Sequence, residues 1–240
     1  MNKIIESVVW KVILFFLLGF VFFAGITFPI VQNPVQWYEF PYIQGLDENA
    51  KIIFFHVPTA WLTVVAFLMS TFFSIQYLRK KDMDYDRKAL ASAQLGMVFC
   101  ILATVTGSVW AKFAWGSFWH WDPRETSIFA LLLIYGALFA LRSAIEIDEK
   151  KATLSAVYSI IAFVTVPFFI FIMPRIMVGM HPGDASDMAK GNAGPVVNFK
   201  MNSNMQLVFY LSLVGFTMLY LWIWRLAYRT SVLDRLIRKD

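Results

Sequence analysis

Six apolar segments, each long enough to cross a lipid bilayer as a helix, constrain the fold of this chain more than any other feature. The chain has 240 residues, and the segments are residues 8–30, 58–78, 89–110, 123–141, 153–173 and 205–224. A span needs about 20 apolar residues, and its backbone must satisfy its own hydrogen bonds in lipid, as a helix does. The sequence therefore predicts an all-α integral membrane protein, in which residues 1–240 form a single six-transmembrane-helix bundle.

The composition excludes a water-soluble domain, because 59% of the residues are hydrophobic and only 15% are charged. A single core in a chain of this length could not bury that much apolar surface. The net charge of +5 does not indicate nucleic-acid binding, since Lys and Arg cluster at segment ends, where membrane topology accounts for them. The one cysteine, Cys100, lies in an apolar segment and is expected to be a small core residue.

The positive charges predict the orientation of the bundle. The connections 79–88 and 142–151 are short and rich in Lys and Arg, and both chain ends are basic as well. The connections 31–57, 110–127 and 174–204 carry fewer positive charges along more residues. By the positive-inside rule both termini are cytoplasmic, and these last three connections face outward. We call them the outer loops.

One outer loop, residues 110–127 with the sequence WAKFAWGSFWHWDPRETS, is dense in tryptophan. It is too short and too charged to cross a bilayer, so we expect an amphipathic segment on the membrane surface. Residues three and four apart are neighbours on a helix, so one helical face would carry Trp115, Phe118, Trp119 and Asp122. Aromatic residues gather at membrane interfaces in any case. This density nevertheless favours a platform for a large flat ligand.

All three histidines lie in the outer loops or at the membrane edge of a span: His56, His120, and His181 in loop 174–204. A lone loop histidine is usually solvated, but two on the same side as a tryptophan platform can supply both axial ligands of a haem iron. The chain has no CxxCH motif, which predicts that haem would not be held through thioether bonds. Copper is the alternative, because thioether sulfurs beside His181 suit Cu(I); they belong to Met177, Met180 and Met188.

Residues 122–125, with the sequence DPRE, begin the fourth span. Asp122, Pro123 and Glu125 match an N-cap, a first-turn proline and a capping-box partner. Capping alone is enough to explain both acidic residues. Arg124 is different, because a cation in the first turn opposes the helix dipole. We therefore expect an anionic partner for Arg124, either Asp122, Glu125 or a ligand carboxylate such as a haem propionate.

The stretch WGSFWHWDPRETS resembles the tryptophan-rich WWD signature of the haem-handling proteins of cytochrome c maturation, the superfamily that includes CcmC, CcmF and CcsA. HVPTAW at residues 56–61 is similar to the start of the second span in CcmC, as are the chain length and six-span layout. The resemblance implies non-covalent binding of haem b at the outer face of the bacterial cytoplasmic membrane and its transfer to the haem chaperone CcmE. It also implies association with CcmA, CcmB and CcmD, and a transport function without enzymatic chemistry.

The resemblance also implies the site residues. The axial ligands are His56 and His181, and the platform is Trp115, Trp119, Trp121 and Asp122, with Phe118 on its aromatic face and Arg124 beside a propionate. Two features depart from the CcmC pattern. His120 stands where the family usually has a non-ligating residue, which leaves a third possible ligand. The sequence DPRET is closer to the CcsA version, which leaves open a role in a CcsA-type complex that attaches haem to apocytochrome c.

Overall fold

The computed structural model describes residues 2–5, 7–43, 46–181, 184 and 201–237 of the chain. Within these residues, six helical segments are long and apolar enough to cross a membrane. They are Val8–Thr27, Asp47–Lys80, Met83–Trp115, Pro123–Ser143, Asp148–Ile176 and Ser203–Asp234. The structure therefore confirms the all-α fold and all six predicted spans.

Five of the six spanning helices extend beyond the apolar segments that predicted them, whereas the first ends at Thr27 and not at residue 30. In chain order they are α1 (Asn2–Ile5), α2 (Val8–Thr27), the 3-10 helix η1 (Asp47–Phe54), α3 (His56–Lys80), α4 (Met83–Trp115), α5 (Pro123–Ser143), α6 (Asp148–Pro167), the π-helix η2 (Phe168–Ile172), α7 (Met173–Ile176) and α9 (Ser203–Ile237). Strands β1 (Ile30–Val31) and β2 (Phe40–Pro41) pair in parallel. Helix α4 begins before its apolar segment because its first turn is capped. The Asp82 carboxylate accepts a hydrogen bond from the Asp84 amide at 2.8 Å, and this cap stabilises a helical turn of polar residues.

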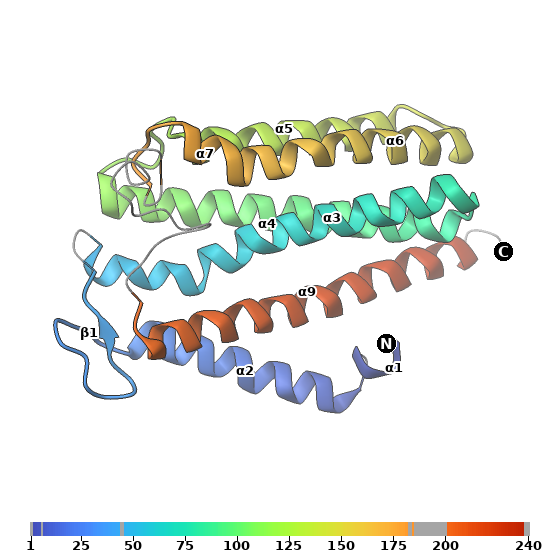
Figure 1. Ribbon diagram of the computed structural model, residues 1–240. Coiled ribbons are helices and arrows are strands. Elements are labelled where there is room, and N and C mark those ends of the chain that lie inside the picture. Colours follow the sequence, from blue (N-terminus) through green and yellow to red (C-terminus); the bar gives the residue numbers. More distant parts are fainter. Residues whose placement is uncertain (1, 6, 44–45, 182–183, 185–200, 238–240) are drawn as a thin grey trace.

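The long helices lie side by side, and the connections between them gather at two ends of the bundle (Figure 1). One end carries β1, β2, η1 and the segment between α4 and α5; we call it the loop end. The opposite end, the termini end, carries α1 and the short connections from α3 to α4 and from α5 to α6. The described parts of all three predicted outer loops therefore share one end, as expected. The assignment of the termini end to the cytoplasm stays a prediction.

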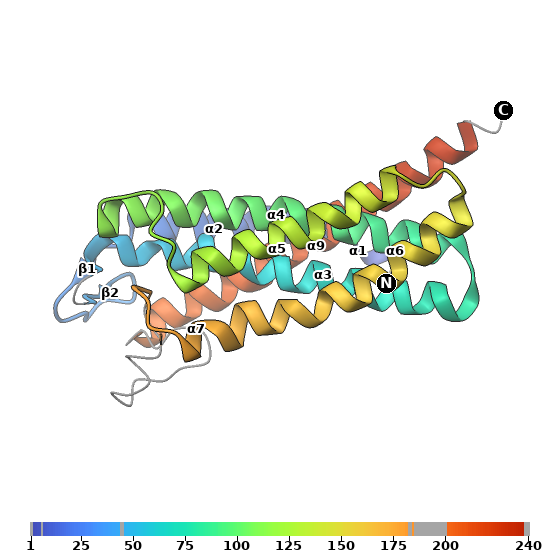
Figure 2. The same cartoon turned by 90° about the horizontal axis from the view of Figure 1, so that it is seen from above.

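Helices α3 and α4 pack together at the centre of the bundle, with α2 and α9 on one side and α5 and α6 on the other (Figures 1 and 2). The buried face of α3 is rich in small polar residues, namely Thr59, Thr63, Ser70, Thr71 and Ser74. Small side chains let membrane helices approach closely. The Ser70 and Ser159 hydroxyls lie 3.3 Å apart, and the Thr71 hydroxyl donates to the Ser159 carbonyl at 3.3 Å, so hydrogen bonds join α3 to α6.

A buried ion pair joins α4 to α5 at the termini end. The Arg142 guanidinium donates two hydrogen bonds to the Asp86 carboxylate, at 2.7 and 2.9 Å. The two side chains are only 14% and 9% exposed, respectively. The sequence predicted Arg142 only as a topology-setting charge, whereas the structure gives it a specific partner within the bundle.

Candidate functional site

The tryptophan-rich segment does not form the helical face expected from the sequence. Helix α4 ends at Trp115, where Gly116 adopts a left-handed conformation with φ of 88°. The Gly116 amide closes the helix on the Lys112 carbonyl, and the Lys112 ammonium donates to the Gly116 carbonyl at 2.9 Å. Residues 116–122 are irregular until α5 begins at Pro123. A glycine C-cap followed by an aspartate N-cap interrupts the helix, so the prediction of one face carrying residues 115, 118, 119 and 122 is wrong.

The tryptophans separate into two groups. In the first, the Trp110 and Trp115 rings lie 4.8 Å apart between centroids, and the His181 imidazole lies 4.7 Å from Trp115 and 6.1 Å from Trp110. In the second, Trp119 and Trp121 lie 5.7 Å apart, and each lies 6.3 Å from Phe129 on α5. The structure therefore brings Trp115 to a predicted iron ligand, together with Trp110, which the sequence had not placed among the site residues.

Two predicted platform residues are largely exposed to solvent or lipid. Trp121 is 68% exposed and has a φ of 57°, an uncommon conformation for a bulky residue. Phe118 is 56% exposed, and the Lys112 ammonium lies 5.7 Å from the centre of its ring. Neither side chain is held against the first tryptophan group, so their contact with a ligand stays a prediction.

The predicted capping box at the start of α5 is confirmed. The Asp122 carboxylate accepts from the Arg124 amide at 2.9 Å, and Pro123 is the first helical residue. The Glu125 carboxylate accepts from the Asp122 amide at 3.3 Å and from the His120 amide at 2.7 Å. Both acidic side chains therefore fix the chain path into α5, as the local sequence predicted.

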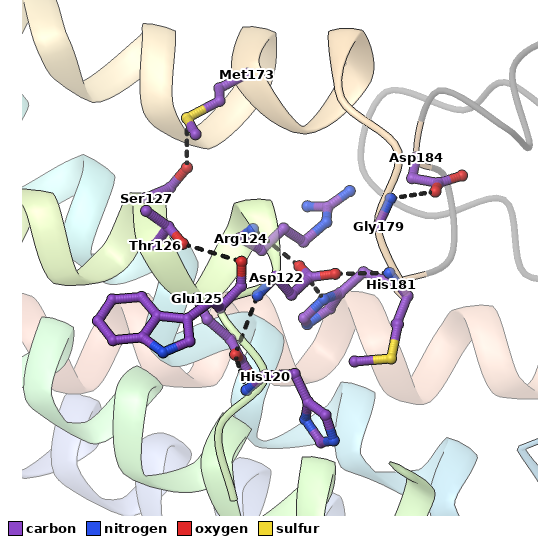
Figure 3. Close-up of polar contacts among 12 residues, drawn as sticks. His120, Asp122, Arg124, Glu125, Thr126, Ser127, Met173, Gly179, His181 and Asp184 are labelled. Atoms are coloured by element: carbon purple, nitrogen blue, oxygen red, sulfur yellow. Dashed lines mark hydrogen bonds and ion pairs between the residues drawn. The ribbon is translucent and has the colours of Figure 1, made fainter. Parts of the chain in front are cut away.

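Asp122 has a second role that capping does not explain, because it also binds the outer loop that follows α7 (Figure 3). Its Oδ1 atom lies 2.7 Å from Nδ1 of His181, and its Oδ2 atom accepts from the Met180 amide at 2.6 Å. Burial raises the pKa of the Asp122 carboxyl, but the hydrogen bond and charge of His181 and the two amide donors outweigh it and lower the pKa to about 2. The carboxylate is therefore ionised at neutral pH, so Nδ1 of His181 is the donor.

His56 is held by a separate set of contacts on α3 and α4. Its Nδ1 atom lies 3.0 Å from the Thr106 hydroxyl oxygen, and that hydroxyl donates its one hydrogen to the Leu102 carbonyl at 2.7 Å. Thr106 therefore accepts a hydrogen bond from Nδ1 of His56. A Cβ atom at position 107 would lie 2.9 Å from Cε1 of the imidazole, so Gly107 leaves the room that this ring needs.

The two predicted iron ligands lie against the same last turns of α4. Thr106 and Gly107 contact His56, and Trp110, one helical turn further along, contacts His181. His181 lies near enough to His56 to interact with it electrostatically. In both imidazoles Nδ1 makes a hydrogen bond to a side chain, as in metal sites where a second-shell acceptor orients a histidine. The residues present thus suit an axially ligated haem iron.

Arg124 lies at the edge of a small cavity beside this network. Its Nε atom is buried and has no hydrogen-bond partner among the described residues. The guanidinium interacts electrostatically with Asp122, one of the predicted anionic partners, and with Asp184. The cavity is lined by Asp122, Arg124, Met177, Gly179, His181 and Asp184, among others, and the space between these side chains has no room for a water molecule. Ligand pockets are usually far larger, so a bound group would have to displace some of these side chains.

The remaining sequence-based candidates are less well placed. The His120 ring packs edge-on against Trp115 at 5.8 Å, and its Nδ1 atom is buried without a partner in the described part of the chain. Met177 and Met180 are both exposed, and Met188 lies outside the described residues. Among residues 2–5, 7–43, 46–181, 184 and 201–237, no three His, Cys, Asp or Glu side chains group as a metal site. Copper ligation through the thioether sulfurs of this loop stays a prediction.

Sequence reasoning missed four residues that position the histidines, namely Thr106, Gly107, Gly179 and Met180. A glycine within an apolar helix, as at position 107, is a general sign of close packing. Nothing in the sequence indicated that the packing partner would be His56. Gly179 likewise permits close packing in the loop, because a Cβ atom there would lie 2.5 Å from Oδ2 of Asp122.

Comparison with known proteins gives consistent matches over most of the chain. The family model described as CcmC, Heme exporter protein C, matches residues 7–240. Heme exporter protein C of Paracoccus denitrificans is 31% identical over 194 residues, which cover 81% of this chain and 77% of that protein. The protein of the same name from Bradyrhizobium diazoefficiens is 30% identical over 197 residues, which cover 82% and 71%. Cytochrome c biogenesis protein CcsA of Panax ginseng is 31% identical over 156 residues, which cover 62% of this chain but only 42% of that protein.

Proposed function

Because this chain belongs to the CcmC family of haem exporter proteins, we propose that it binds haem at the loop end of its helix bundle for cytochrome c biogenesis. It passes this haem to a CcmE-like chaperone. The haem is haem b, bound without a covalent link, and the chain catalyses no reaction of its own. The protein works in the bacterial cytoplasmic membrane with its termini in the cytoplasm, beside CcmA-, CcmB- and CcmD-like subunits.

The observation that carries this proposal is the paired support of two histidines at one end of the bundle. His56 begins α3 and donates to Thr106, and His181 follows α7 and donates to Asp122. Each therefore offers Nε2, the atom that commonly ligates iron when Nδ1 bonds to the protein. Trp110 and Trp115 beside His181 supply an aromatic surface for a porphyrin. Phe118, Trp119 and Trp121 extend the aromatic surface toward an incoming ring or partner.

Arg124 suits one carboxylate of the cargo, because its buried Nε atom has no hydrogen-bond partner among the described residues. The space that Arg124 lines has no room for a water molecule, so a propionate would bind there only with displacement of a neighbouring side chain. We expect Arg124→Ala to weaken haem binding about tenfold or more, because charge-assisted hydrogen bonds contribute roughly 1.5–3 kcal/mol. Haem titration of detergent-purified protein measures this, with Arg124→Lys as the charge-preserving comparison. Unchanged haem content and spectrum in Arg124→Ala would remove the assignment.

An absorption spectrum of the purified protein, recorded before and after dithionite, tests the proposed function directly. We expect a Soret band and the spectrum of a low-spin haem with two imidazole ligands, released intact by acid–organic extraction because no thioether bond holds it. Metal analysis of the same sample separates haem from the copper alternative. Protein that carries copper and no haem, or that takes up no haem when it is added, would contradict the proposal.

The second candidate function is haem attachment to apocytochrome c in a CcsA-type complex. The DPRET sequence and the match to the Panax ginseng protein favour it. The partial coverage of that protein and the absence of histidines deep within the apolar segments argue against it. Formation of a thioether-linked cytochrome by this chain, without a haem chaperone, would favour the attachment function.

A further inference from the structure

We propose that Asp122 is a positioning residue for His181, and that haem release begins when His181 separates from Asp122 while His56 stays bound to the iron. This inference rests on the proposed function, because it concerns the order in which two axial ligands leave the cargo. It follows from a difference in how the two imidazoles are held.

His56 is fixed by the helical scaffold. It is the first residue of α3, and α3 packs against α4 along the bundle. Its hydrogen-bond acceptor, Thr106, and its steric neighbour, Gly107, both lie inside α4. Helix α4, Met83–Trp115, continues on both sides of this contact. Displacing His56 would require α3 or α4 to move, which disturbs the packing of the whole bundle.

His181 is held differently, because it lies in an irregular segment after the short helix α7. The described hydrogen bonds that tie residues 180 and 181 to the rest of the bundle both end on Asp122: the Met180 amide at 2.6 Å and Nδ1 of His181 at 2.7 Å. The Trp110 and Trp115 rings add packing but no hydrogen bond to the imidazole. Loss of the contact with Asp122 therefore removes both hydrogen bonds that the structure describes for these two residues.

Asp122 stays in place when the loop leaves. It is only 4% exposed, its carboxylate caps α5 by accepting from the Arg124 amide, and its own amide donates to the Glu125 carboxylate. Figure 3 shows its carboxylate between the start of α5 and the loop segment that carries Gly179 and His181. Gly179 permits this approach, since a Cβ atom there would lie 2.5 Å from Oδ2. The Asp122 carboxylate thus holds the His181 imidazole from a fixed position at the start of α5.

The release step is a ligand exchange at iron. The bond between iron and Nε2 of His181 breaks, and its electron pair stays on that nitrogen. A nitrogen or oxygen donor of the acceptor protein then forms the new bond with its own electron pair. Neither the oxidation state of iron nor the number of protons on the imidazole changes. His56 keeps the cargo on the protein until the acceptor is in place.

Gly179→Ala in the full-length, detergent-purified protein tests this order, because the added Cβ would push the backbone at residue 179 away from the Asp122 carboxylate without altering either histidine side chain. We expect the haem to be retained through His56, a larger five-coordinate, high-spin fraction, and exchange with added imidazole about tenfold faster than in the wild type. The matched control is Gly136→Ala on α5, where an added Cβ meets nothing within 4 Å. It should match the wild type.

Asp122→Asn provides a second route to the same readout if Gly179→Ala does not fold. Asparagine still caps a helix, but its one oxygen cannot accept from the Arg124 amide, the Met180 amide and His181 together. It should show the same high-spin shift.

If the wild type is low-spin and both variants leave its spectrum unchanged, the inference is overturned and the proposed function stands. Complete haem loss from both variants also overturns it, since His56 should then suffice. A wild type that binds no haem overturns the proposed function as well.

Discussion

His56→Ala should remove most of the haem from the purified protein, and the double variant with His181→Ala should carry none. Second-shell changes at metal sites commonly cost about 10–100-fold in affinity, and loss of a ligand held by the helical scaffold costs more. His181→Ala alone should instead change the spectrum from low-spin to high-spin, with part of the haem retained. The Soret absorbance per protein and the spin-state bands measure both effects.

His120→Ala is the matched control for these variants, because it removes an imidazole from the same end of the bundle. The His120 ring contacts Trp115 but makes no described hydrogen bond from its side chain. It should therefore change haem content much less than His56→Ala. Loss of haem in His120→Ala, with His56 and His181 both dispensable, would contradict the ligand assignment.

Arg142→Ala should lower the free energy of unfolding by about 3–5 kcal/mol, the usual cost of leaving one charge of a buried ion pair without its partner. The Asp86 carboxylate would remain inside the bundle, where its side chain is 9% exposed in the intact pair. Unfolding by sodium dodecyl sulfate in mixed micelles, followed by circular dichroism, measures the change. Haem binding by the folded fraction should be unaffected, because the pair lies at the termini end.

Two further variants distinguish the pair from a general loss of packing. Replacing both partners with apolar residues, as in Asp86→Leu with Arg142→Met, should recover most of the stability. Lys151→Ala removes the partner of Asp148, whose side chain is 80% exposed, and should change stability little. If Arg142→Ala and Lys151→Ala lower the free energy of unfolding equally, burial of the Arg142–Asp86 pair does not account for the effect.

The local features of the site could be predicted because short sequence patterns encode them. Asp122, Pro123 and Glu125 form the expected capping box, since the hydrogen bonds of a cap connect residues within one turn. His56 lies at the start of the second span, as Pro58 in the first turn indicated. The break in helix after Trp115 was missed, although Gly116 was the available signal.

The two-group arrangement of tryptophans could not be read from their spacing. The spacing suits one helical face, but the left-handed Gly116 redirects the chain and separates Trp115 from Trp119 and Trp121. Arg124 shows the same limit. Its position opposed to the helix dipole indicated an anionic partner, and Asp122 was among those predicted, whereas Asp184, which also acts on it electrostatically, was not.

The sequence by itself determined the six spans, the sharing of one end by the outer loops and the start of α5, because hydropathy and capping depend on neighbouring residues. Tertiary structure alone decided which acceptor holds each histidine and which arginine meets Asp86. His56 and Thr106 are 50 positions apart, and His181 and Asp122 are 59 apart. Such contacts depend on how far each helix is rotated and shifted against its neighbours, and that is fixed by the packing of the whole bundle.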